Sequence, residues 1–362
     1  FTNVPAQFIY SLLPLGAAVV PIAAIAIFCY YIISTLYPID KIIGRIYPFI
    51  GCFLIIITLI VLICLIPYGN MIPDIVLTPE GIAAALTAHP ADQPIIPMLF
   101  ITIACGILSG FHATQSPIVA RTMRSERDGR KIFYGMMVGE GLIAMIWAAA
   151  VSILFTMQPD MLGVSNGNQI LATTTSVLLP AVLASLSLIV FVFLAVTSGD
   201  TALRVLRTTI ADFLHIVQSS GRMRCLLILP IVAVISALLV WSNIIPTGYA
   251  VLWNYFSWFN QLIVSCALLL ATAYLACKGK PWILTAVPAA GIVFVCVSYI
   301  LWVSPAHLAG APIGFGLPLE ISYICAGAAA LVLCTAAVIS GKRKGHKPMF
   351  PPEAPARYES DA

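Results

Sequence analysis

Long apolar segments recur along this 362-residue chain, and they constrain its fold more than any other feature. Hydrophobic residues make up 61% of the sequence and charged residues 9%, against roughly 25% charged residues in a typical soluble domain. So few polar side chains cannot cover a water-soluble globule. Because every backbone polar group must be hydrogen-bonded internally in lipid, we expect an all-α protein, a polytopic bundle of transmembrane helices.

Nine segments have about the length that a membrane-spanning helix needs, which is roughly 20 apolar residues. They lie near residues 11–37, 46–67, 95–118, 132–156, 178–199, 225–241, 250–277, 282–303 and 318–340. The transmembrane bundle thus occupies residues 1–340. Residues 341–362 are basic, then rich in proline and acidic residues, which predicts a disordered tail.

The positions of the basic residues support this topology. All 18 Lys and Arg fall in connections on one side of a nine-span bundle, near 41–45, 121–131, 204–224 and 278–280, and in the tail. The positive-inside rule places these connections and the C-terminus in the cytoplasm. The N-terminus then lies outside. Because the chain begins with Phe1 rather than Met, we expect a fragment that lacks earlier spans.

Two connections have features of short helices. In the outer connection 68–94, Thr78 is suited to cap a helix over 79–88, and Pro79 to open its first turn. In the inner stretch 200–218, apolar and basic residues alternate at helical spacing, which predicts a helix lying along the cytoplasmic membrane face.

Ionisable residues inside predicted spans are costly and therefore candidates for function. His112 and Glu140 lie about eight residues from the cytoplasmic ends of the third and fourth spans, roughly 12 Å deep. In an antiparallel hairpin the two would meet and could bind or relay a proton. The alternative is a structural hydrogen-bonded pair that holds two helices together.

The segment around His112 is unusually polar and small for a membrane span. It includes Ser109, Gly110, Gln115 and Pro117. A helix broken here would offer backbone groups and the Gln115 amide to a carboxylate or cation. A simple proline kink is the alternative.

Two further sets of polar residues are candidates for substrate or ion binding. Ser198, Asp200 and Thr201 end the fifth span and offer oxygen ligands for Na⁺ or a protonatable carboxylate, although Asp200 could also be an N-cap. Asn260 and Gln261 lie in the seventh span among aromatic residues, which form either a substrate-facing strip or an interfacial belt.

No sequence motif indicates an enzyme, a cofactor or a metal site. The sequence has no Walker lysine loop, no nucleophile elbow and no His-Glu-x-x-His helix. Ten cysteines include no Cys-x-x-Cys pair, and most fall in apolar segments. We therefore expect neither ATP coupling within this chain nor a nucleic-acid partner.

Several strings together resemble the carbon starvation protein A family of bacterial membrane transporters. They are YPIDKIIGRIYPFIG (37–51), PMLFITIACGILSGFHATQSPIVAR (97–121), FYGMMVGEGLIAMIWAAA (133–150), FLAVTSGDTALRVLRTTIADFL (193–214) and LWNYFSWFNQ (252–261). The resemblance implies a fold related to the amino acid/polyamine/cation transporters, with inverted repeats. It also implies uptake of peptides or pyruvate across the bacterial inner membrane under nutrient starvation.

The sequence therefore favours a secondary transporter that is coupled to protons, with Na⁺ as the other candidate ion. A membrane sensor of nutrients that carries out no net transport is the alternative, and an intramembrane enzyme is third.

Overall fold

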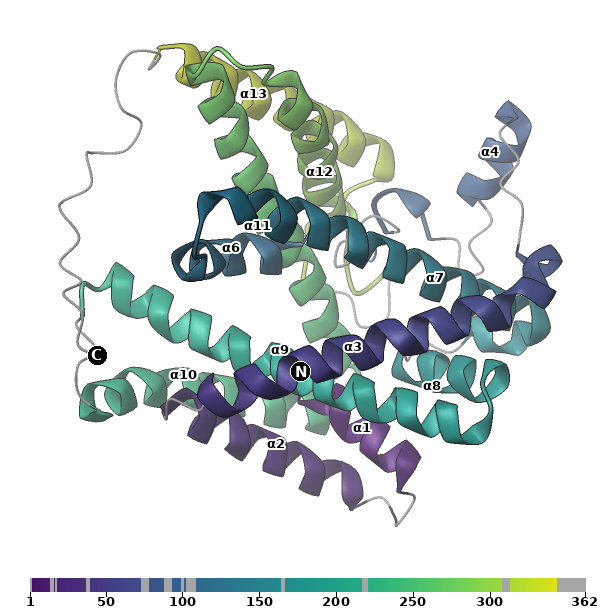
Figure 1. The fold of residues 1–362 in the computed structure, drawn as a ribbon. Coiled ribbons are helices and arrows are strands. Elements are labelled where there is room, and N and C mark those ends of the chain that lie inside the picture. Colours follow the sequence, from purple (N-terminus) through teal and green to yellow (C-terminus); the bar gives the residue numbers. More distant parts are fainter. Residues whose placement is uncertain are drawn as a thin grey trace. The chain divides into compact units, whose positions relative to one another are not determined.

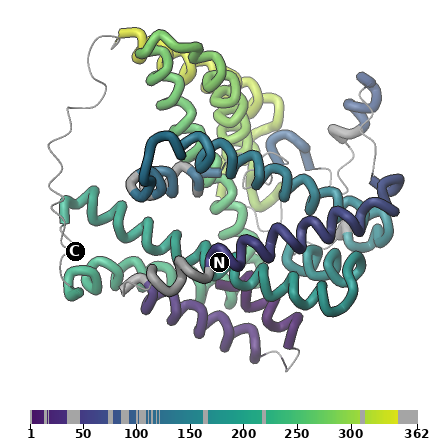
Figure 2. The backbone as a smooth tube through the Cα atoms, viewed as in Figure 1, coloured from purple at the N-terminus to yellow at the C-terminus, as the bar shows by residue number. Residues whose placement is uncertain are grey.

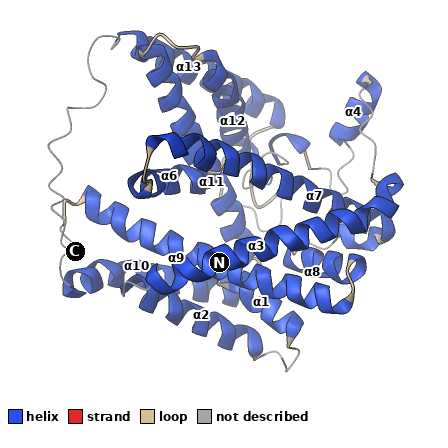
Figure 3. Cartoon of the chain, in the orientation of Figure 1, coloured by secondary structure: helices blue, strands red, loops and turns tan. Residues whose placement is uncertain are grey.

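The computed structural model describes residues 2–13, 16, 18–36, 40–72, 78–87, 93–98, 101, 109–163, 167–216, 221–307 and 313–343. Over these residues the regular secondary structure is entirely helical, with no β-strand (Figures 2 and 3). The all-α prediction is confirmed for this part of the chain.

Seven helices in the described part of the chain are long and apolar enough to cross a membrane, and each coincides with a predicted span. They are Tyr47–Met71, Glu126–Met157, Ala181–Phe213, Gly221–Ile244, Gly248–Cys277, Ile283–Trp302 and Leu319–Arg343. A shorter apolar helix, Val19–Ser34, falls in the first predicted span. Part of the predicted span 95–118 and residues 344–362 of the tail lie outside the described residues, so the count of nine stays a prediction.

The chain forms two compact units, each built from two stretches of sequence. Unit 1 comprises Phe1–Ile82 and Gln115–Leu239, and unit 2 comprises Ala83–Thr114 and Val240–Ala362. Three helices contain residues of both units: α4 (Pro79–Thr87), α6 (Gly110–Thr122) and α10 (Gly221–Ile244).

In unit 1, α9 packs against four other helices, α1, α2, α3 and α8 (Figure 1). The α-helices that lie wholly in this unit are α1 (Asn3–Leu12), α2 (Val19–Leu36), α3 (Asp40–Leu65), α7 (Met136–Met157), α8 (Gly167–Leu178) and α9 (Ala181–Phe213). Phe191 of α9 lies 5.9 Å from the ring of Phe8 and 5.2 Å from that of Trp147, between centroids. Aromatic packing thus joins α1, α7 and α9 in one core.

Unit 2 contains three helices that all pack against one another, α11 (Gly248–Cys277), α12 (Ile283–Trp302) and α13 (Leu319–Arg343) (Figure 1). Thr272 and Thr285 are hydrogen-bonded at 3.0 Å. Near the other end of the pair, the Trp258 indole donates to the Cys296 carbonyl at 3.0 Å. The two contacts fix α11 and α12 as an antiparallel pair.

Helix α9 differs from the sequence prediction. It runs for 33 residues from Ala181 to Phe213 without interruption, whereas we predicted that a span would end near 199 and that a separate surface helix would cover 200–218. The separate helix is wrong, because residues 200–213 continue the same α-helix. Asp200 and Arg204 therefore lie on one rigid element.

The helix predicted over 79–88 is confirmed. Helix α4 begins at Pro79, and the Thr78 hydroxyl accepts a hydrogen bond from the Gly81 amide at 3.1 Å. This is the contact expected of an N-cap, because the first amides of a helix have no partner within it.

We predict that Gly341→Ala destabilises unit 2. A Cβ at this position of α13 would lie 2.3 Å from the Ala273 carbonyl oxygen of α11, so the two helices would have to separate. Overpacking of this kind costs about 1–3 kcal/mol, which thermal unfolding in detergent would detect. Gly327→Ala in the same helix is the control, since its Cβ would meet nothing within 4 Å. Equal melting temperatures for the two variants would contradict the close contact.

Candidate functional site

A buried acid on α9 is the centre of a polar cluster in unit 1. Asp200 is 2% exposed and Ser34, on α2, is fully buried. The Ser34 hydroxyl donates a hydrogen bond to Oδ1 of Asp200. Arg204, one turn further along α9, places Nη2 at 3.2 Å from Oδ2 of the same carboxylate. The acid is thus held by a hydroxyl from one helix and a guanidinium from its own.

Arg204 also contacts Ser34 directly. Its Nη2 lies 3.3 Å from the Ser34 hydroxyl and 3.5 Å from the Ser34 backbone carbonyl. Ser34 is in the last turn of α2, where carbonyls have no partner within the helix. The guanidinium, whose side chain is 21% exposed, therefore stabilises both the acid and the end of α2.

A third helix contributes Tyr47, near the start of the apolar part of α3. Its side chain makes hydrogen bonds with Asp200 and Thr201. The Thr201 hydroxyl also donates to the Thr197 carbonyl within α9 at 2.8 Å. Helices α2, α3 and α9 thus meet at Asp200, and we call Ser34, Tyr47, Asp200, Thr201 and Arg204 the acid cluster.

The acid cluster corrects one alternative from the sequence. Asp200 cannot be an N-cap, because it lies in the interior of a continuous helix. Ser198 lies half-buried two residues earlier. Two helical residues are separated by about 200° around the axis, so Ser198 is on the opposite side of α9 from Asp200. Of the predicted set, the structure brings together Asp200 and Thr201.

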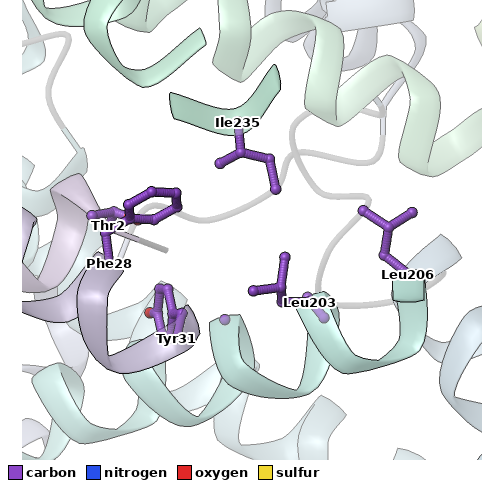
Figure 4. A pocket seen from close by; sticks show the side chains of 8 residues that line it. Thr2, Phe28, Tyr31, Leu203, Leu206 and Ile235 are labelled. Atoms are coloured by element: carbon purple, nitrogen blue, oxygen red, sulfur yellow. The ribbon is translucent and has the colours of Figure 1, made fainter. Parts of the chain in front are cut away.

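A cavity of about 200 Å³ is lined by residues of α2, α9 and α10 within unit 1 (Figure 4). Tyr31 of α2 and Gly199 and Leu203 of α9 line it, with Thr2, Phe28, Ala202, Leu206 and Ile235. Gly199 and Leu203 each precede a charged residue of the cluster by one position. The cavity wall is mostly apolar, which suits an uncharged or hydrocarbon group.

The amides predicted in the seventh span are buried in unit 2. On α11, Asn260 is 5% exposed and Gln261 is fully buried. The Ser109 hydroxyl lies 3.3 Å from Oδ1 of Asn260. A Cβ at Gly110 would come within 2.5 Å of the Asn260 carbonyl oxygen, so the first residue of α6 lies directly against α11.

The remaining predicted residues lie on α6 and α7. His112, Gln115 and Glu140 are each half-buried. The Gln115 Nε2 is buried and has no hydrogen-bond partner among the residues described. Helix α6 begins at Gly110 and continues through Pro117, so the proline does not interrupt it. His112 belongs to unit 2 and Glu140 to unit 1, and their pairing stays a prediction.

No group of three or more His, Cys, Asp or Glu side chains that could hold a metal ion occurs among the described residues.

Comparison with protein families decides the relationship that the motifs suggested. The family model for carbon starvation protein CstA matches residues 16–178 and 160–299. The chain belongs to the CstA family. In the part of the chain that the structure describes, seven long apolar helices agree with a multi-pass membrane protein.

Individual CstA relatives match shorter regions. A protein of Haemophilus influenzae described as an uncharacterized membrane protein is 43% identical over 162 residues, covering 40% of this chain and 42% of that protein. The pyruvate/proton symporter BtsT of Escherichia coli is 38% identical over 24% of this chain and 13% of the symporter. The peptide transporter CstA of Helicobacter pylori is 41% identical over 17% and 9%. This chain thus matches less than half the length of each of these three relatives.

No solved structure matches the chain.

We predict that Arg204→Met and Asp200→Asn are energetically coupled. Arg204→Met leaves a nearly buried carboxylate without its cation, and breaking a buried ion pair in this way costs about 3–5 kcal/mol. In the double variant the charge is gone, so most of that loss should be recovered. Thermal unfolding of the single and double variants gives the coupling, with exposed Arg222→Met on α10 as control. Strictly additive losses would contradict an ion pair that matters for stability.

Proposed function

We propose that this protein is a secondary active transporter that takes up a small carboxylate-bearing nutrient, a short peptide or pyruvate, together with protons. The observation that carries the proposal is Asp200, a carboxylate 2% exposed within an apolar helix long enough to span a membrane. Ionisable groups in such helices are costly and are typical of ion and proton pathways. The names of the E. coli and H. pylori relatives supply the substrates and the coupling ion.

The acid cluster suggests how coupling would work. While Asp200 is ionised, Arg204 is paired with it at 3.2 Å. A proton on Asp200 removes the negative charge that holds the guanidinium. Arg204 is then able to bind the carboxylate of a substrate, since guanidinium and carboxylate groups form strong charge-assisted hydrogen bonds. Substrate and proton would thus bind together, and loss of either would restore the ion pair.

Other polar residues receive supporting roles in the same proposal. His112 and Glu140 are two further candidate proton-binding residues. Gln115, Ser198, Thr201, Asn260 and Gln261 are candidate contacts for substrate or ion. We place the protein in the bacterial inner membrane with a cytoplasmic C-terminus, and we assign it a role in carbon or nutrient starvation.

We predict that Asp200→Asn separates proton coupling from substrate movement. In proteoliposomes with an inward proton gradient, the variant should accumulate at least tenfold less pyruvate or peptide than the wild type. It should retain counterflow of labelled substrate, because a neutral Asn resembles the protonated acid. Asp212→Asn is the matched control, an exposed acid on the same helix.

Two outcomes would contradict this proposal. Undiminished accumulation by Asp200→Asn would exclude Asp200 as the coupling acid. Substrate binding without flux in the wild type would favour a sensor. Replacing Na⁺ with another cation tests the alternative ion, since a proton-driven carrier should be unaffected while a protonophore abolishes uptake.

We predict that His112→Ala and Glu140→Gln each lower uptake and change its dependence on pH. Removing either titratable group from a proton pathway shifts the pH range in which transport occurs. Uptake measured between pH 5 and 8 tests this. If both variants keep the rate and pH profile of the wild type, the two residues have no part in coupling.

A further inference from the structure

Gln261 is an unusual residue in unit 2 because both polar atoms of its side-chain amide lack hydrogen-bond partners among the described residues. The side chain is fully buried on α11. Neither Nε2 nor Oε1 has a hydrogen-bond partner among the described residues. Buried polar side chains in proteins are nearly always hydrogen-bonded, and an unpaired amide in an apolar environment costs several kcal/mol. The unpaired amide therefore points to a bound group that forms hydrogen bonds with Nε2 and Oε1 of Gln261.

The polar neighbours of Gln261 on the same helix face are already engaged. Ser257, one turn before, donates to the Trp253 carbonyl at 3.0 Å. Ser265, one turn after, donates to the backbone carbonyl of Gln261 itself at 3.0 Å. Both hydroxyls thus donate to carbonyls of their own helix rather than to the Gln261 amide.

A second buried group without a partner lies on the neighbouring helix. Tyr299 of α12 is fully buried, and its hydroxyl has no hydrogen-bond partner within the described part of the chain. Two residues of α11 contact Cys296 of α12. The Trp258 indole donates to the Cys296 backbone carbonyl, and the Ser265 hydroxyl contacts the Cys296 sulfur. Those two contacts bracket Gln261 along α11. Tyr299 follows Cys296 by three residues, roughly 4.5 Å along the helix.

The chemistry of the amide limits what the ligand can be. Oε1 needs a donor and Nε2 needs an acceptor. A cation alone would leave the N–H groups unpaired, and a carboxylate alone would leave the oxygen unpaired. The buried polar side chains described in unit 2 are all uncharged hydroxyls and amides. These features favour a neutral ligand group that offers a donor and an acceptor side by side.

We infer that Gln261 and Tyr299 form a subsite for an amide group, such as the peptide bond of a substrate. The peptide N–H donates to Oε1 of Gln261 and the peptide carbonyl accepts from Nε2, while Tyr299 pairs with a further polar group of the ligand. This inference rests on the proposed function, because it identifies where one of the two candidate substrate classes is bound. It gives peptides contacts that pyruvate, which only accepts hydrogen bonds, cannot make.

The test compares ligands with and without a peptide N–H that can donate a hydrogen bond. Binding of dialanine, of dialanine methylated on the peptide nitrogen and of pyruvate is measured on the purified protein. The wild type should bind dialanine at least tenfold more tightly than the methylated form. Gln261→Met, which removes both polar atoms at similar volume, should bind the two peptides equally weakly. Tyr299→Phe should also weaken dialanine binding, as Gln261→Met does.

Stability is the control for folding. Gln261→Met should melt at or above the wild-type temperature, because it removes unpaired buried atoms. Ser257→Ala, one turn away on the same face, should leave the preference for dialanine intact. The comparison of the two peptides on the wild type requires no variant, so the test remains decisive if Gln261→Met fails to fold.

Equal affinity of the wild type for both peptides would overturn the inference. Unchanged peptide preference in Gln261→Met would also overturn it and would indicate a structural water at the amide. Proton-driven pyruvate uptake without peptide discrimination would reject the amide subsite and leave the proposed transport function standing. Peptide discrimination in a protein that shows no flux would do the reverse.

Discussion

The contact between Asp200, Arg204 and Ser34 is the constraint on which our account of unit 1 depends. A carboxylate in a membrane-length helix is tolerated only if its charge is compensated, and here the compensation comes from a guanidinium one turn away and a hydroxyl on α2. Arg204 also donates to a backbone carbonyl at the end of α2, so the residue that pairs with Asp200 also holds α2 against α9. A change in the charge of Asp200 would therefore alter the contacts between α2 and α9.

Unit 2 has the opposite character, since its described buried polar residues are all uncharged. Its three helices pack closely enough that Gly341 lies against the Ala273 carbonyl. In this closely packed, uncharged interior the Gln261 amide and the Tyr299 hydroxyl have no hydrogen-bond partner among the described residues. The two units thus provide different chemistry: an ion pair suited to protons and carboxylates, and a neutral amide suited to hydrogen-bonding groups.

Much of the fold could be predicted from the sequence because bilayer crossing requires long apolar helices, and these are visible in one dimension. The end of α9 could not, since apolar character falls after residue 199 while the helix continues to Phe213. Asp200 is recognisable in the sequence as a charged residue at the end of a predicted apolar span. Arg204 was detectable from its i, i+4 spacing, whereas Ser34 and Tyr47 lie more than 150 residues away and carried no signal. In the sequence, Tyr299 cannot be distinguished from other aromatic residues of the apolar spans.

The central claim is that substrate binding and protonation of Asp200 occur together. Infrared difference spectra of the reconstituted protein test this directly, because a protonated carboxylic acid has a carbonyl band that a carboxylate lacks. Adding pyruvate or dialanine to the wild type at neutral pH should produce that band, and Asp200→Asn should abolish it while Asp212→Asn retains it. Substrate binding with no change in the carboxylic acid region would contradict the account.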